Sequence, residues 1–268
     1  MRERQPLTPE LEIMRHRGWR GGVITPHRAF VRLPLTARRI LESATLAAVG
    51  SGAWVAALPA VGRLWARIFA FWSARLALRS EVTLVPQDWI RHVPFVLPCF
   101  GLPAGPASGT IWWITAGATV GLFAATFFFS EEALPWSYLI RGICLLQATA
   151  LGYFAVASAR FPHDLPSYTI SMLLFSCILI GFVPLMYAFT FYLLNFSLWQ
   201  KILLTVATIA HLVLFVPQQY MLQVYVLHVS VLFMPVLYFV FGPFLDIFAF
   251  IGFYAWGMSW RGTEPFET

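Results

Sequence analysis

Ionisable side chains are almost absent from the long stretch between Gly109 and Trp260. Across the whole chain only 11% of the 268 residues are charged, whereas 59% are hydrophobic. A soluble protein of this length cannot bury so much apolar surface, because too few polar side chains remain to cover it. The chain has about six apolar segments that are long enough, or nearly so, to cross a bilayer. The sequence therefore predicts an all-α, polytopic membrane helix bundle with about six transmembrane helices and additional interfacial helices.

Lysine and cysteine are also scarce. Of the 18 basic residues only Lys201 is a lysine. Three isolated cysteines, Cys99, Cys144 and Cys177, have neither a paired spacing nor an even count, which argues against a disulfide framework and a zinc site. The sequence has no glycine-rich phosphate loop and no nucleophile with a matched base. These absences predict a protein that is not an enzyme and that binds no metal or cofactor.

Two histidines raise the question of a haem. His211 and His228 fall inside neighbouring predicted spans, and histidines on facing helices are common axial ligands of haem. Measured from a predicted turn at Pro217, the two lie at depths that differ by about 7 Å at the rise of an α-helix. Buried histidines bonded to neighbouring carbonyls account for the same pattern. We therefore expect no haem, and a cytochrome is only the third functional hypothesis.

The basic charge is concentrated at the N-terminus. Nine of the arginines precede residue 40, in a segment that four prolines interrupt. Residues 1–42 are therefore predicted to be a basic extramembrane arm, either on the positive-inside face of the membrane or as a mitochondrial targeting segment. The arm lacks a recognisable nucleic-acid-binding module and interleaved aromatic residues, so nucleic acid is not an expected partner.

The rest of the chain is predicted to form one bundle over residues 43–241, with an extramembrane connection at residues 63–108. The expected spans are residues 43–62, 109–129, 138–158, 167–194, 202–216 and 220–241. The fifth contains only about fifteen apolar residues, fewer than the roughly twenty that cross a bilayer. Gly242-Pro243 interrupts the sixth, and residues 242–268 are predicted to be a C-terminal tail with an interfacial or seventh helix, of which the interfacial helix is favoured.

Four arginines recur at multiples of four within the predicted connection. They are Arg63, Arg67, Arg75 and Arg79. This spacing, among several aromatic residues, is typical of an amphipathic helix that lies along the membrane surface. Basic side chains there either extend to the interface or attract anionic head groups. We predict that these four arginines bind membrane lipids, with cardiolipin as the candidate.

Three local patterns resemble a known family when they are taken together. The first is the basic segment at residues 35–41, before the first span, and the second is the long span that opens at Ser167 and reaches Val183-Pro184. The third is a short fifth span that ends at Pro217 and is followed by glutamines. In this order they resemble TatC, the core subunit of the twin-arginine translocase, over about residues 34–241.

The resemblance implies a non-enzymatic translocase component or scaffold in an energy-transducing membrane. The chain has Phe182 and Gln219 where the family carries carboxylates, so the resemblance implies the scaffold more than recognition of a twin-arginine signal peptide. The positions it suggests for partner binding are Arg38, Arg39, Glu131, Pro217 and Gln223.

The alternative is a structural subunit of a mitochondrial respiratory or ATP-synthase complex, because phenylalanine-rich helices with few charges suit a surface that contacts lipid and protein. Both hypotheses expect lipids and other membrane subunits as partners. Both place the chain in the mitochondrial inner membrane, or alternatively in a bacterial plasma membrane.

Overall fold

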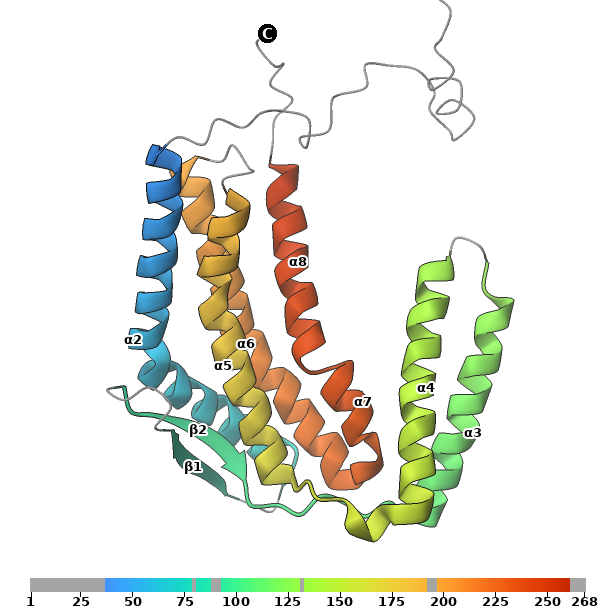
Figure 1. Cartoon of the computed structure of the whole chain (residues 1–268). Helices are drawn as coiled ribbons and strands as arrows, with labels where there is room; N and C mark the ends of the chain where they lie inside the picture. Colours follow the sequence, from blue (N-terminus) through green and yellow to red (C-terminus); the bar gives the residue numbers. More distant parts are fainter. Residues whose placement is uncertain (1–36, 79–80, 88–92, 131–132, 192–196, 261–268) are drawn as a thin grey trace, which may run out of the picture. The chain divides into compact units, whose positions relative to one another are not determined.

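A computed structural model describes residues 37–78, 81–87, 93–130, 133–191 and 197–260. Six helical segments of this described part are long and apolar enough to cross a membrane. The predicted all-α bundle of about six spans is thus confirmed, and the chain is an integral membrane protein. In chain order (Figure 1), the elements are α2 (Ala37–Arg75), β1 (Val82–Gln87), β2 (Phe95–Phe100), α3 (Gly109–Ala125), η2 (Thr126–Phe128), α4 (Leu134–Ala157), η4 (Ser158–Arg160), α5 (Leu165–Phe191), α6 (Leu198–Val229), η5 (Val231–Phe233), α7 (Met234–Phe239) and α8 (Pro243–Ser259).

α2 differs from the predicted span followed by a separate interfacial helix. It begins at Ala37, inside the predicted arm, and continues as one 39-residue helix to Arg75. Pro59 lies within it, and Figure 1 shows that the second half of α2 runs in a different direction from the first. Proline removes one intrahelical hydrogen bond and bends a helix without necessarily ending it. The predicted boundary at residue 62 therefore lies within one bent helix, and the helix expected to follow it is continuous with the first span.

The connection contains a small antiparallel sheet, in which Val82 of β1 lies opposite Phe100 of β2. β2 packs closely against the second half of α2. The rings of Phe69 and Phe100 stack with their centroids 5.6 Å apart. A Cβ atom added to Gly62 would lie 2.2 Å from the carbonyl oxygen of Val96, so the helix approaches the strand at a distance that only glycine permits.

Replacing Gly62 with alanine is expected to lower the free energy of unfolding by about 1–2 kcal/mol, because β2 has to move away from α2. Gly52 of the same helix is the matched control, since a Cβ atom there would meet no atom within 4 Å. Gly52→Ala should be neutral or slightly stabilising. Unfolding in SDS, followed by circular dichroism, compares the two variants. Equal losses of stability would contradict the close contact between α2 and β2.

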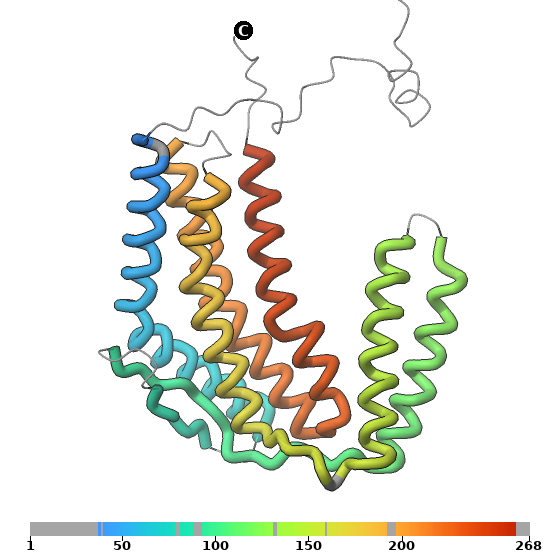
Figure 2. Tube along the Cα trace, viewed as in Figure 1, coloured from blue at the N-terminus to red at the C-terminus, as the bar shows by residue number. Residues whose placement is uncertain are grey.

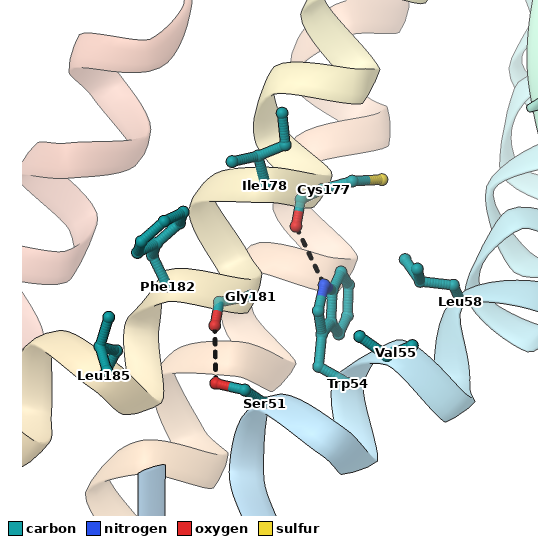
Figure 3. A pocket seen from close by; sticks show the side chains of 9 residues that line it. All are labelled: Ser51, Trp54, Val55, Leu58, Cys177, Ile178, Gly181, Phe182 and Leu185. Atoms are coloured by element: carbon teal, nitrogen blue, oxygen red, sulfur yellow. Dashed lines mark hydrogen bonds between the residues drawn. The ribbon is translucent and has the colours of Figure 1, made fainter. Parts of the chain in front are cut away.

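The first half of α2 forms side-chain hydrogen bonds to the backbone of α5 (Figure 3). The indole Nε1–H of Trp54 donates to the carbonyl oxygen of Cys177 at 2.9 Å, and the hydroxyl of Ser51 donates to that of Gly181 at 3.1 Å. Gly181 allows this approach, because a Cβ atom there would lie 2.9 Å from Cδ1 of Trp54. An apolar pocket of about 260 Å³ lies beside these contacts.

The last two spans are divided differently from the prediction. The expected fifth span, residues 202–216, and the first part of the expected sixth form one 32-residue helix, α6. The predicted turn at Pro217 is therefore wrong. The sixth span consists of η5, α7 and α8 and covers Val231–Ser259. It includes the segment that we expected to lie at the membrane surface (Figure 2).

Pro217 does not end α6 because another helix supplies the missing hydrogen bond. Proline has no N–H, so the carbonyl of Val213, four residues earlier, loses its intrahelical donor. The indole Nε1–H of Trp65 lies 2.8 Å from this carbonyl oxygen, and the Trp65 side chain is fully buried. In an interior without water, this donor from α2 allows α6 to continue through the proline.

Candidate functional site

The sixth span is broken between α7 and α8. α7 ends at Phe239, and α8 begins at Pro243, which has no N–H to continue the helix. Gly242 between them has no room for a side chain, because a Cβ atom there would lie 2.5 Å from the carbonyl oxygen of Tyr238. Within a membrane, backbone groups freed by such a break need partners from the protein.

Two glutamines of α6 supply those partners. Nε2 of Gln219 lies 2.7 Å from the carbonyl oxygen of Phe241 and 3.4 Å from that of Gly242. Nε2 of Gln223, one helical turn further along α6, donates to the Phe241 carbonyl as well. Oε1 of Gln223 accepts a 2.7 Å hydrogen bond from the hydroxyl of Tyr168 in α5. The two amides therefore join α6 to the break and, through Tyr168, to α5.

A buried carboxyl group lies next to the break. Asp246 is in the first turn of α8 and has no exposed surface. Its Oδ2 accepts a 2.8 Å hydrogen bond from the hydroxyl of Ser176, which also lies 3.1 Å from the hydroxyl of Tyr220. Oδ1 of Asp246 and Oε1 of Gln219 are both buried, and neither has a hydrogen-bond partner within the described part of the chain.

We call these residues of α5, α6 and α8, together with the break that they surround, the polar junction. Its side chains are Tyr168, Ser176, Gln219, Tyr220, Gln223 and Asp246.

An apolar groove of about 590 Å³ lies between α4 and the sixth span. Almost its entire lining is hydrophobic, with one wall from α4 and the other from α7 and α8. The lining residues are Tyr138, Leu139, Gly142, Ile143, Leu145, Leu146, Thr149, Phe239, Val240, Phe244 and Phe248. At one end α4 is fixed to η5, because Nε2 of Gln147 donates to the carbonyl oxygen of Leu232 at 3.3 Å.

The predicted partner-binding residues lie in different places. Gln223 is central to the polar junction, and Pro217 lies two residues before Gln219 in the same helix. Arg38 lies near the start of α2 and forms a 2.9 Å ion pair with Glu42, whose carboxylate is also 3.8 Å from Nζ of Lys201. The Arg39 side chain and all of Glu131 lie outside the described residues.

The predicted lipid-binding arginines follow the second half of α2. Arg63, Arg67 and Arg75 are exposed, and the guanidinium of Arg75 lies 5.3 Å from the centre of the Phe71 ring. Arg79 lies outside the described residues. The two histidines considered for haem occupy different surroundings, since His211 packs against Phe215 and Phe253 whereas His228 is exposed at the end of α6.

Sequence reasoning missed the acidic member of the polar junction. The sequence predicts that Asp246 lies in an interfacial or a seventh helix, of which the interfacial helix is favoured, because Gly242-Pro243 interrupts the last apolar segment. The length of the apolar segment was the signal that contradicts this reading, since 29 residues from Val231 to Ser259 remain apolar on both sides of the break. Ser176 and Tyr220 gave no such signal, because isolated hydroxyls are common in membrane helices.

No family model, no curated protein and no solved structure matches the chain.

Proposed function

We propose that the chain is a non-enzymatic structural subunit of a larger complex in an energy-transducing membrane, and that it binds a transmembrane helix of a neighbouring subunit in the groove between α4 and the sixth span. The groove is the observation that carries this proposal. Its lining is almost entirely hydrophobic, as suits the apolar side chains of a membrane helix, and it lies along two segments of membrane-spanning length.

The α4 wall of the groove favours a helix as its occupant. Gly142 has open space at the position of its missing side chain, and Thr149 follows it seven residues later on the same face. Small residues in this arrangement let a second helix backbone approach closely, which a lipid chain does not require. The aromatic wall of α7 and α8, with Phe244 and Phe248, then provides the contact area on the other side.

The surrounding helices also leave much surface for neighbours. In the most apolar part of the sixth span, only 17% of the residues are buried within the chain. The same fraction is buried in the span that contains α3. Trp113 and Val120 of α3 are 72% and 69% exposed. Such surfaces suit a subunit that is surrounded by lipid and by other membrane proteins.

Photo-crosslinking in native membranes tests the proposal. A benzophenone amino acid replaces Leu145 on one wall of the groove or Phe248 on the other, and Leu214, which is 53% exposed on α6 and does not line the groove, is the control. We expect both groove positions to capture the same polypeptide, within one of its apolar membrane-length segments, and the control to leave it uncaptured. Adducts with lipid alone at both groove positions would refute the proposed occupant.

A translocase component is the second candidate. It is supported by the resemblance of residues 35–41 and 167–184 to TatC, whereas the third segment, at Pro217, lies within a continuous helix. We therefore place the structural subunit first. Co-purification in mild detergent distinguishes them, because a translocase is expected with small single-span subunits and a structural subunit with a respiratory or ATP-synthase complex.

The proposed location is the mitochondrial inner membrane, with a bacterial plasma membrane as the alternative. The exposed arginines of α2 support contact with anionic lipids such as cardiolipin, because basic interfacial residues attract anionic head groups.

A further inference from the structure

We propose that the polar junction is a membrane-embedded proton-binding site, in which Asp246 holds one proton on Oδ1 as a neutral carboxylic acid. The proposal concerns a different part of the chain from the groove and does not depend on the partner that the groove binds.

The surroundings of Asp246 favour its neutral form. The side chain is fully buried in a membrane-spanning segment, and no ion pair involves it among the described residues. A carboxylate buried without a cation is strongly unfavourable inside a membrane, so such a group binds a proton or a counterion.

The other titratable groups around the junction do not supply a counterion. α8 packs against α5, α6 and α7. These helices contribute the phenols of Tyr168, Tyr220 and Tyr238 and the thiol of Cys177, all of which are uncharged in their protonated forms. His211 of α6 packs against Phe253, seven residues beyond Asp246 along α8, or about 10 Å at the helical rise. The ammonium group of Lys201, also in α6, lies 3.8 Å from the carboxylate of Glu42 in α2.

The hydrogen bonds of the junction lack one donor. Oδ1 of Asp246 and Oε1 of Gln219 are both buried acceptors without a partner. The amide of Gln219 is held at the break by its bonds to the Phe241 and Gly242 carbonyls, so its Oε1 also lies there. A proton on Oδ1 turns that unpaired acceptor into a donor, and it needs no additional space, unlike a metal ion. The proposal assigns Oε1 of Gln219, the other unpaired acceptor at the break, as the partner of this donor.

Because Asp246 lies beside the break between α7 and α8, its protonation affects how α8 is held in the bundle. Broken membrane helices place polar side chains and free carbonyls at the depth where transported ions bind. Loss of the proton leaves a charge without a counterion in the first turn of α8, which is unfavourable inside the membrane even though the hydroxyl of Ser176 still donates to it. We therefore expect proton release to loosen α8, whose other face lines the groove through Phe244 and Phe248.

Infrared spectroscopy of the purified protein tests the proposal, because the chain has only three aspartates, Asp88, Asp164 and Asp246. Asp164 is exposed outside the spans, and its hydrogen bond to Ser167 lowers the pKa of its carboxyl group, so it is ionised at neutral pH. In protein labelled with ¹³C-aspartate we expect a band of one protonated carboxylic acid at pH 7. The band should disappear in Asp246→Asn and should be lost in wild type as the pH rises.

Three results would overturn the proposal. The first is a spectrum at pH 7 in which all aspartates are ionised, and the second is a protonated band that persists in Asp246→Asn. The third is an ionised Asp246 whose spectrum responds to sodium but not to choline, which would make the junction a cation site. If Asp246→Asn does not fold, labelled Asp88→Asn serves instead, because its protonated band can then come only from Asp246.

Discussion

Replacing Trp65 with phenylalanine is expected to lower the free energy of unfolding by about 3 kcal/mol, because a buried carbonyl loses its hydrogen bond and the side chain becomes smaller. The carbonyl is that of Val213, which accepts from the Trp65 indole at 2.8 Å. The phenyl ring keeps most of the apolar contact but has no N–H. Unfolding in SDS, followed by circular dichroism, measures the loss.

A double-mutant cycle with Pro217 separates the hydrogen bond from the packing. Pro217→Ala restores a backbone N–H that can bond to the Val213 carbonyl within α6. In this background Trp65→Phe should cost about 1 kcal/mol less than in the wild type, since the carbonyl keeps a donor. Equal costs in the two backgrounds would show that the indole hydrogen bond is not what allows α6 to pass through the proline.

Replacing Gln223 with leucine is expected to destabilise the protein by about 2–4 kcal/mol, because it leaves two buried groups with fewer hydrogen bonds. Tyr168 loses its acceptor, and the Phe241 carbonyl keeps only the amide of Gln219. We expect the contact between α6 and the break to loosen. Thermal unfolding and hydrogen exchange of residues 239–246 measure the two effects.

Gln218→Leu is the matched control for this variant. Gln218 is the neighbour of Gln219 in the same helix, but its side chain is exposed and donates only to the carbonyl of Leu214 within α6. The substitution should change stability by less than about 0.5 kcal/mol. If both leucine variants have the same stability, the role that we assign to Gln223 is wrong.

The sequence predicted the class of the fold because membrane helices are determined by composition over long segments. Six apolar segments in a chain with few charges lead to a helical membrane protein whatever their exact partners. The expected number of spans was therefore right even though the last two were divided incorrectly.

The predicted boundaries of the last two spans were wrong because two prolines that look alike in the sequence have different surroundings. Pro217 lies inside a helix, since Trp65, 148 positions away in the sequence, bonds to the carbonyl that it frees. Pro243 follows Gly242, whose φ of −96° and ψ of −126° lie outside the helical region, and the chain breaks there. The residues near Pro217 in the sequence do not reveal the hydrogen bond from Trp65 to the Val213 carbonyl.

The candidate site was only partly predictable for the same reason. The resemblance to TatC suggests Gln223 as a partner-binding position after a turn at Pro217, but that turn does not form, and hydrogen bonds to the break are a different role for this side chain. Asp246 was assigned to the membrane surface, and its burial depends on α5 and α6 together. A carboxyl group that is distant in sequence from its partners is recognised only when the helices are assembled.

The break between α7 and α8 also bears on how the protein is made. α7 has only six residues and α8 seventeen, so each alone is shorter than the roughly twenty residues of an average spanning helix. The free carbonyls between them are bonded by the amides of Gln219 and Gln223, which belong to the helix synthesised just before. The C-terminal segment thus completes its hydrogen bonds only beside an inserted α6, and the order of synthesis provides the partner before the segment that needs it.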